Sequence, residues 1–216
     1  MAATGTKYRA VIFDLGGVVF PSPLDVFRAY ERDHGLPDRF ISEVVLADPV
    51  DGAWSRLERG ELTLATFPAE FEAECRAAGG QVDAGSLMLG IGRGFAPRPE
   101  MLGAIRTIRD HGLSTGALTN NWVADETRSN GAASPALDGL FDVVVESAVV
   151  GLRKPDPRIY EMVCTELDVS PPEAVFLDDL GTNLKPARVM GMTTIKVGDP
   201  RSALSELETL LQFSLG

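Results

Sequence analysis

Four polar features of this 216-residue chain stand at or just after apolar runs, and their residue types are suited to chemistry. A carboxylate can act as a nucleophile or a metal ligand, a hydroxyl or amide can donate to an anion, and an ammonium group can offset negative charge. Adjacent carboxylates repel each other unless a cation separates them, so a carboxylate pair that closes an apolar strand favours a metal site. The features are Asp14, Thr119-Asn120, Lys154 and Asp178-Asp179.

Alternating strands and helices would bring these residues to one place. Helical patterns lie between several of the apolar runs that predict strands, such as the helix that Asp156-Pro157 opens. Such alternation predicts an α/β fold with a doubly wound parallel sheet covered on both faces. Ligands bind outside the carboxyl ends of the strands in such a sheet, which is where the polar features fall. The predicted strands are 8–15, 113–119, 141–147, 174–178 and 193–197.

Residues from about 20 to 96 break this alternation, because they contain helical patterns and no convincing strand. One helix is expected from Ser22-Pro23 to Gly35, a second is expected to carry Trp54 and end at Gly60, and a third follows the spacing of Phe67, Phe71 and Cys75. We therefore expect residues 1–19 and 97–216 to form the α/β core, and residues 20–96 to form an inserted helical cap domain.

Composition narrows the class of protein. The formal net charge of −11 disfavours a nucleic-acid partner, since such proteins usually present a basic face. No apolar run is long enough to cross a bilayer, and the first residues lack a secretory pattern. Cys75 and Cys164 form no CxxC pair and are expected to be reduced, buried thiols. We expect a cytoplasmic protein without a membrane partner; the sequence leaves its oligomeric state open.

The order of these features carries a family resemblance. The stretches VIFDLGGVV, ALTNN, GLRKPDPRIY and VFLDDLGTNLKPA resemble the four motifs of the haloacid dehalogenase superfamily. The chain is also similar to the amino-terminal phosphatase domain of soluble epoxide hydrolase, through TNNW, RLERGELTL and LDDLGTNLKPARVMGM. The resemblance spans nearly the whole chain. It implies a Rossmann-like core, a small helical cap inserted after the first motif, and a phosphatase that acts on a small phosphorylated metabolite.

The resemblance also implies a role for each residue of the motifs. Asp14 would attack phosphorus and form an aspartyl phosphate. Mg²⁺ would be held by Asp14, Asp179 and the backbone carbonyl of Gly16, with Asp178 holding a metal-bound water. Lys154 would offset charge on the nucleophile and on the phosphoryl group, and it would bind substrate together with two neighbours in the second motif. There the Thr119 hydroxyl would donate to a phosphoryl oxygen and Asn120 would orient the substrate.

Gly16 departs from the family pattern, in which a second Asp two residues after the nucleophile acts as acid and base. Such a group typically contributes about 10²- to 10⁴-fold to the rate. Its absence favours one of three options: an easily departing leaving group, an acid supplied by the cap, or a weakly active protein. Besides a phosphatase, two alternatives stay open. One is a haloacid dehalogenase, which the Asp178-Asp179 pair disfavours because paired carboxylates without a metal would repel a carboxylate substrate, and the other is a weakly active binding or regulatory module, which only Gly16 supports. The charged cap candidates are Arg56, Glu58 and Arg59, for which a solvated helix face is the simpler interpretation.

Overall fold

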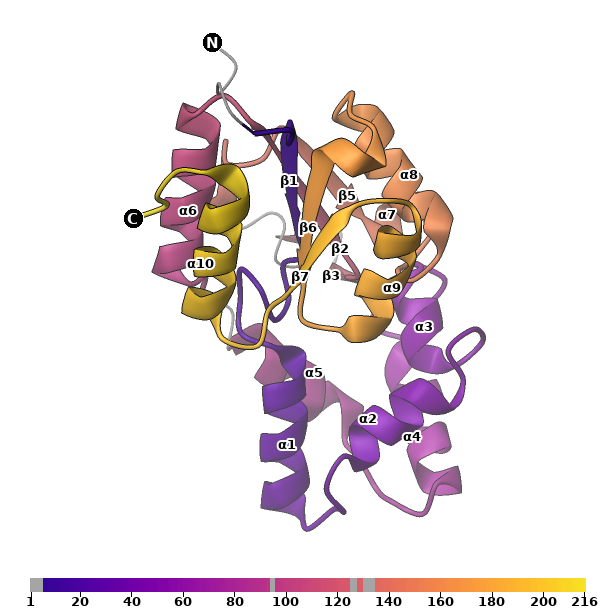
Figure 1. Cartoon of the computed structure of the whole chain (residues 1–216). Helices are drawn as coiled ribbons and strands as arrows, with labels where there is room; N and C mark the ends of the chain where they lie inside the picture. The colour runs from indigo at the N-terminus through magenta and orange to yellow at the C-terminus, as the bar shows by residue number, and fades with distance from the viewer. Residues whose placement is uncertain (1–5, 94–95, 125–127, 130–134) are drawn as a thin grey trace.

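The computed structural model describes residues 6–93, 96–124, 128–129 and 135–216, and it has two parts (Figure 1). One part is a parallel sheet covered by helices, and the other is a group of helices below it, drawn in indigo to magenta. No helix in these described ranges is long and apolar enough to span a membrane.

Five parallel strands form the sheet, in the order β5-β2-β1-β6-β7. The predicted α/β fold with a parallel sheet is therefore confirmed. The strands lie within the predicted runs, and β6 has the predicted bounds. The strands are β1 (Ala10–Phe13), β2 (Ser114–Thr119), β5 (Val143–Glu146), β6 (Ala174–Asp178) and β7 (Thr193–Lys196).

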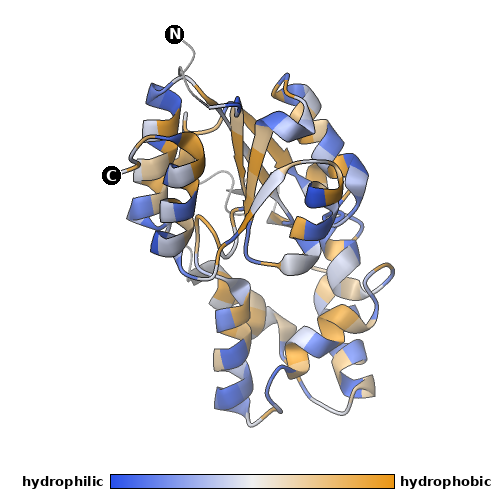
Figure 2. Cartoon of the chain, in the orientation of Figure 1, coloured by the Kyte–Doolittle hydropathy of each residue, from blue (hydrophilic) through white to orange (hydrophobic). Residues whose placement is uncertain are grey.

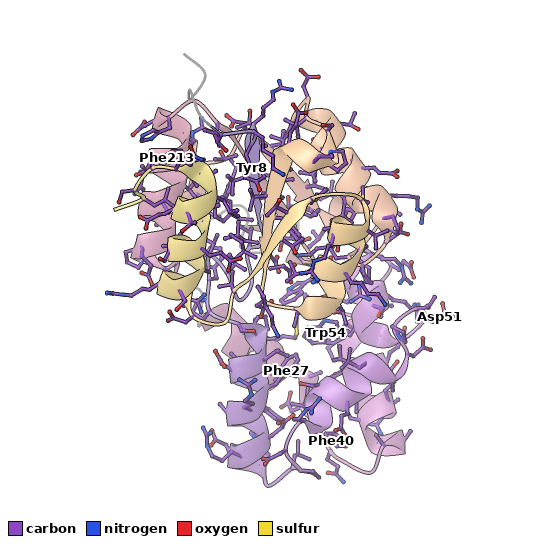
Figure 3. All side chains as sticks on the ribbon, in the orientation of Figure 1. Tyr8, Phe27, Phe40, Asp51, Trp54 and Phe213 are labelled. Atoms are coloured by element: carbon purple, nitrogen blue, oxygen red, sulfur yellow. The ribbon has the colours of Figure 1, made fainter. Side chains whose placement is uncertain are left out.

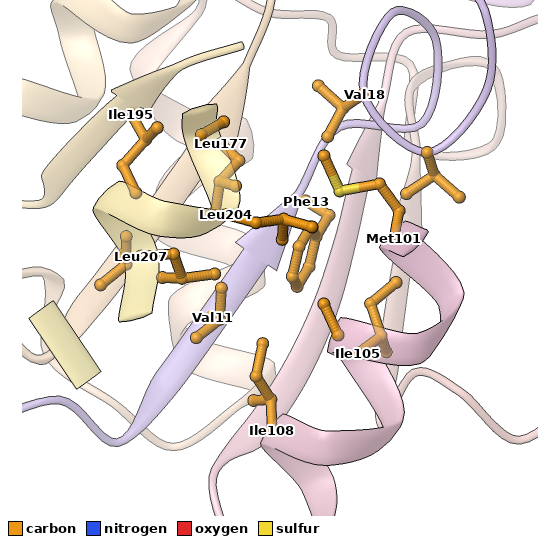
Figure 4. Packing of buried hydrophobic residues seen from close by; sticks show 14 of the residues in the cluster. Val11, Phe13, Val18, Met101, Ile105, Ile108, Leu177, Ile195, Leu204 and Leu207 are labelled. Carbon is orange, nitrogen blue, oxygen red and sulfur yellow. The ribbon is translucent and has the colours of Figure 1, made fainter. Parts of the chain in front are cut away.

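Both faces of the sheet are buried, which explains why β1 is continuously apolar and why β6 is apolar up to its last residue, Asp178. Val11 and Phe13 of β1 point into the cluster formed with α6 (Pro99–Asp110) and α10 (Pro200–Leu211), which Figure 4 shows from close by. The alternate residues of β1, Ala10 and Ile12, join the cluster on the other face, which includes residues of α8 (Pro157–Glu166) and α9 (Gly181–Val189). β1 and β6 are accordingly among the most hydrophobic segments in Figure 2.

Further elements connect the strands. The helix that Asp156-Pro157 was predicted to open is confirmed, because the Asp156 side chain accepts a hydrogen bond from the Arg158 amide. Both cysteines are buried and free, as expected. The connecting elements are α7 (Ser147–Val150), α8 (Pro157–Glu166), α9 (Gly181–Val189), the short strands β3 (Val123–Ala124) and β4 (Arg128–Ser129), and the 3₁₀ turns η1 (Pro135–Leu137) and η2 (Pro171–Glu173).

Residues 23–93 form the helical region, which packs around an apolar cluster of its own that includes Phe27, Leu57 and Phe71. Gly35 ends the first helix in the left-handed conformation, as predicted. Pro68 lies in the first turn of its helix, where a missing N–H costs little. The division of the chain into two domains stays a prediction. The helices are α1 (Pro23–His34), α2 (Phe40–Ala47), α3 (Ala53–Glu58), α4 (Phe67–Ala77) and α5 (Ala84–Arg93).

Candidate active site

Three carboxylates meet where β1 and β6 end. Phe13 and Leu177 are paired in the sheet, so Asp14 and Asp178 leave neighbouring strands at the same level. The Asp14 amide donates to the Leu177 carbonyl at 2.8 Å. Asp14, Asp178 and Asp179 each offer a carboxylate oxygen, and these oxygens lie within 4.8 Å of one another. The topology therefore assembles the acidic cluster that the sequence predicted.

Lys154 reaches this cluster from the loop between α7 and α8, and its side chain is fully buried. Its Nζ lies 2.9 Å from Asp14 Oδ1 and 2.7 Å from Asp178 Oδ2, and it donates to the Leu118 carbonyl at 2.9 Å. An ammonium group has three protons, and each has an acceptor here. The lysine is thus fixed between the predicted nucleophile and the end of β6.

The electrostatics of the cluster favour a cation. Burial raises the pKa of Asp14 well above its usual range; Lys154 opposes this rise, while Asp178 and Asp179 add to it. Burial, assisted by the charge of Asp178, raises the pKa of Asp179 to about 6. Burial works to lower the pKa of Lys154, but the carboxylates of Asp14 and Asp178 outweigh it and the pKa is raised. Three carboxylates thus share one ammonium group among the described residues, which leaves negative charge unbalanced.

Asp178 is held by protein donors on both oxygens. Oδ1 accepts from the Leu180 amide at 2.8 Å and from Asn183 Nδ2 at 3.1 Å, and Oδ2 accepts from Asn183 Nδ2 at 3.1 Å as well as from Lys154. The residue is completely buried. These contacts fit the predicted place of Asp178 outside the direct metal ligands. The role of Asn183, which lies in the first turn of α9, was not predicted.

The turn after β1 packs against Asp179. Gly17 has a φ of 79°, and a Cβ there would lie 2.1 Å from Asp179 Oδ2, so only glycine fits. Among the described residues, a Cβ at Gly16 would meet only Pro23, at 3.5 Å, so this position has room for a Cβ. Ser22 was predicted only as the start of a helix, but its hydroxyl donates to Asp179 Oδ2 at 3.0 Å.

The second motif lies at the end of β2. Thr119 is buried, and its hydroxyl makes a long 3.4 Å contact with the Asn120 carbonyl. Asn120 Oδ1 accepts from the Lys154 amide at 2.8 Å, and Nδ2 donates to the Lys154 carbonyl at 3.0 Å and to Glu58 Oε2 at 3.3 Å. The substrate-binding roles of both residues stay predictions. The hydrogen bonds between the Asn120 side chain and the Lys154 main chain were not predicted.

The charged candidates of the helical region separate into two kinds. Arg56 pairs with Glu70 and Glu61, and Arg59 pairs with Glu61, so both arginines are paired within the helical region. Glu58 differs because it is buried and contacts Asn120 directly. The sequence alone does not distinguish the buried carboxylate of Glu58 from a solvent-exposed carboxylate on the same helix.

Comparisons with known sequences give relatives along nearly the whole chain. The chain is 42% identical over 215 residues to acyl-CoA dehydrogenase family member 10 of Mus musculus, a match covering 98% of this chain and 20% of that protein. It is 36% identical over 214 residues to bifunctional epoxide hydrolase 2 of Sus scrofa, covering 93% and 38%. It therefore spans well under half the length of these two relatives. Phosphatase MT3486 of Mycobacterium tuberculosis is 31% identical over 190 residues, covering 85% of this chain and 84% of that protein.

A structural comparison confirms the fold. A HAD-like family hydrolase from Porphyromonas gingivalis matches with a TM-score of 0.65 and 22% identity, covering 93% of this chain and 98% of that one. The model of the haloacid dehalogenase-like hydrolases matches residues 8–191. The resemblance that the four motifs predicted is therefore confirmed, and this chain belongs to the haloacid dehalogenase-like hydrolases.

Proposed function

We propose that the chain is a magnesium-dependent phosphatase that hydrolyses a phosphate ester of a small metabolite through a covalent phosphoryl group on Asp14. The observation that carries the proposal is the placement of the Asp14 carboxylate between the Lys154 ammonium and two further carboxylates at the edge of the sheet. The similarity to a mycobacterial phosphatase along most of both chains supports the same reaction class.

The donor set fits magnesium. Mg²⁺ prefers oxygen ligands and keeps several waters, and the cluster offers carboxylate oxygens with an excess of negative charge. Asp14, Asp179 and the carbonyl of Gly16 would hold the ion, and Asp178 would stay outside because protein donors already occupy its oxygens. When bound, magnesium supplies the positive charge that lets an anionic nucleophile approach an anionic phosphate.

Asp14 has one oxygen suited to attack. Within the described residues, Oδ1 accepts from the Leu15 amide at 2.7 Å and from Lys154, so we assign the attack on phosphorus to Oδ2. An oxygen–phosphorus bond forms to Asp14 as the bond to the leaving oxygen breaks. During this step the Thr119 hydroxyl donates to a phosphoryl oxygen, and the Lys154 ammonium, which stays hydrogen-bonded to its protein acceptors, offsets the negative charge of the phosphoryl group. Water then attacks phosphorus while the bond between phosphorus and Asp14 breaks, so inorganic phosphate leaves, the Asp14 carboxylate is restored and the proton from the water passes to solvent.

Gly16 determines how stable the leaving group of the substrate must be. A glycine cannot hand a proton to the leaving oxygen, which therefore departs with negative charge and takes its proton from water. Esters with a stabilised leaving group, such as aryl or acyl phosphates, suffer least from this lack. We therefore propose that the protein hydrolyses aryl or acyl phosphates faster than simple alkyl phosphates.

The reaction class is tested by two assays on the same preparation. p-Nitrophenyl phosphate is incubated with and without magnesium, and 2-chloropropionate is incubated under the same conditions. The proposal expects phosphate release that chelation by EDTA abolishes, and no chloride release. Chloride release without magnesium would identify a dehalogenase instead, and inactivity in both assays would favour a binding module.

A further inference from the structure

Glu58, at the end of α3, is a buried carboxylate that joins the helical region to the loops of the sheet. Its Oε1 accepts from Trp54 Nε1 at 3.0 Å in its own helix. Its Oε2 accepts from Arg153 Nε at 2.7 Å and Arg153 Nη2 at 2.6 Å, and from Asn120 Nδ2 at 3.3 Å. Donors from three separate segments therefore converge on one carboxylate, unlike the exposed pairs on the rest of the helical region.

Arg153 extends this junction. Besides Glu58, its Nη1 donates to the Pro49 carbonyl at 3.1 Å and to the Ser55 hydroxyl at 3.2 Å. The residue that immediately precedes Lys154 is thus held by the loop between α2 and α3 and by α3 itself. A planar guanidinium with several partners fixes the orientation of the main chain on which it stands.

Asn120 carries the second link to the lysine. Its side-chain amide pairs with both main-chain groups of Lys154, accepting from the amide and donating to the carbonyl. The same Nδ2 contacts Glu58. A continuous path therefore runs from Glu58 through Asn120 to the Lys154 main chain, and from Lys154 Nζ to Asp14.

The two parts of the molecule are close together at this junction. Trp122, two residues beyond Asn120, packs in the apolar cluster of the helical region, with its ring centroid 5.8 Å from that of Trp54. Gly60 approaches Ala148 of α7 so closely that a Cβ would lie 2.4 Å from the Ala148 carbonyl oxygen. Figure 3 shows the labelled Trp54 where the helical region meets the sheet part.

We propose that Glu58 is a positioning residue, which sets the place of Lys154 from the helical region through Asn120 and Arg153. The catalytic part of this inference rests on the proposed function, in which Lys154 assists phosphoryl transfer. Both oxygens of Glu58 are engaged by protein donors, since Oε2 accepts from three N–H groups and Oε1 from an indole N–H, and these contacts suit a positioning role.

The test uses Glu58→Gln, with Glu61→Gln as its matched control. Glu61 lies three residues away and pairs with Arg59 and Arg56; among the described residues, no hydrogen bond or ion pair joins its side chain to Asn120, Arg153 or Lys154. Exchange of the Lys154 amide proton is followed by NMR, together with kcat and KM on p-nitrophenyl phosphate with magnesium. We expect Glu58→Gln to raise the exchange rate about tenfold and to lower kcat about tenfold while KM changes less than about twofold. Glu61→Gln should change none of these.

A second variant separates positioning from folding. The pair Glu58→Met and Arg153→Met removes both charges together, which is tolerated far better than leaving one buried charge alone. It also removes the acceptor for Asn120, so the same faster exchange at Lys154 is expected in a protein that melts cooperatively.

The outcomes distinguish this inference from the proposed function. Unchanged exchange at Lys154 in both variants overturns the inference, whether or not the wild-type protein is a phosphatase. Faster exchange with an unchanged kcat also overturns it, since Lys154 placement would not matter for turnover. If the wild-type protein has no phosphatase activity and the variants still show faster exchange at Lys154, the positioning of the lysine is supported and only the proposed function is refuted.

Discussion

Two buried groups of charged residues lie near Lys154, one on each side, and they differ in the balance of negative and positive charge. At the edge of the sheet, Asp14, Asp178 and Asp179 share one ammonium group, and burial raises the pKa of Asp14 and of Asp179. At the junction with the helical region, Glu58 faces Arg153 one to one, and both its oxygens accept from protein donors. The first group has charge left for a cation, whereas the second is complete without a ligand.

This difference in charge balance distinguishes a binding site from a structural ion pair. A balanced, fully hydrogen-bonded pair is already satisfied, so a ligand has little to add. An unbalanced carboxylate cluster is destabilised until protons or a metal neutralise it.

Removing either half of the aspartate pair should have different consequences. Asp179→Asn should abolish measurable magnesium binding and leave the stability of the metal-free protein intact. Asp178→Asn removes a partner of the buried Lys154 and should lower the free energy of unfolding by about 3 kcal/mol or more. Isothermal titration calorimetry with magnesium and urea unfolding of both variants measure the two effects. Unchanged magnesium affinity in Asp179→Asn would mean that the metal site is misplaced.

Gly17→Ala should disturb the acidic cluster through its backbone. The new Cβ would lie 2.1 Å from Asp179 Oδ2 at a φ of 79°, whereas Gly79, with a φ of 91°, has nothing within 4 Å of a new Cβ. Gly79→Ala is therefore the matched control, because it has only the backbone cost of about 1–2 kcal/mol. We expect urea unfolding to show a larger loss for Gly17→Ala, together with weaker magnesium binding. Equal losses would exclude the predicted contact with Asp179.

The sequence predicted the acidic cluster because each member ends an apolar strand, a pattern that is local and directional. Ser22, Asn183 and the Glu58–Arg153 pair were not predicted, because their partners are set by which loops the tertiary fold brings together. Two helices were also missed for local reasons. The segment of α2 contains several β-branched residues, and that of α5 contains three glycines, both of which weaken the helical pattern.

The pH dependence of stability should depend on magnesium. The pKa of Asp179 in the folded, metal-free protein, about 6, lies above its ordinary value of 3.8, so proton binding favours the folded state. This contribution is full below pH 3.8 and is lost as the pH rises past 6. Magnesium takes the place of the proton, so it should raise the melting temperature more at pH 7.5 than at pH 5.0. In Asp179→Asn, differential scanning calorimetry should show no such pH-dependent gain.

The smallest expected effect concerns Gly16. A Cβ there meets only Pro23, at an ordinary contact distance, so Gly16→Asp has room to supply an acid beside the nucleophile. We expect turnover of alkyl phosphates to rise about tenfold and turnover of aryl phosphates to change less than about twofold. A series of esters graded by leaving-group pKa measures the difference. A shallow dependence in the wild-type protein would show that another group already acts as the acid.

The covalent phosphoryl group on Asp14 is the central claim, and trapping it is its most direct measurement. Excess enzyme with magnesium is mixed with acetyl phosphate or p-nitrophenyl phosphate, quenched in acid within one turnover, digested and analysed by mass spectrometry. The account predicts one phosphoryl group on the peptide that carries Asp14, absent when magnesium is chelated. It also predicts that Asp14→Asn lowers kcat by a factor on the order of 10⁴ or more, with the fold retained. Phosphate release without a phosphorylated Asp14 peptide, together with activity retained in Asp14→Asn, would contradict the assignment of Asp14 as the nucleophile.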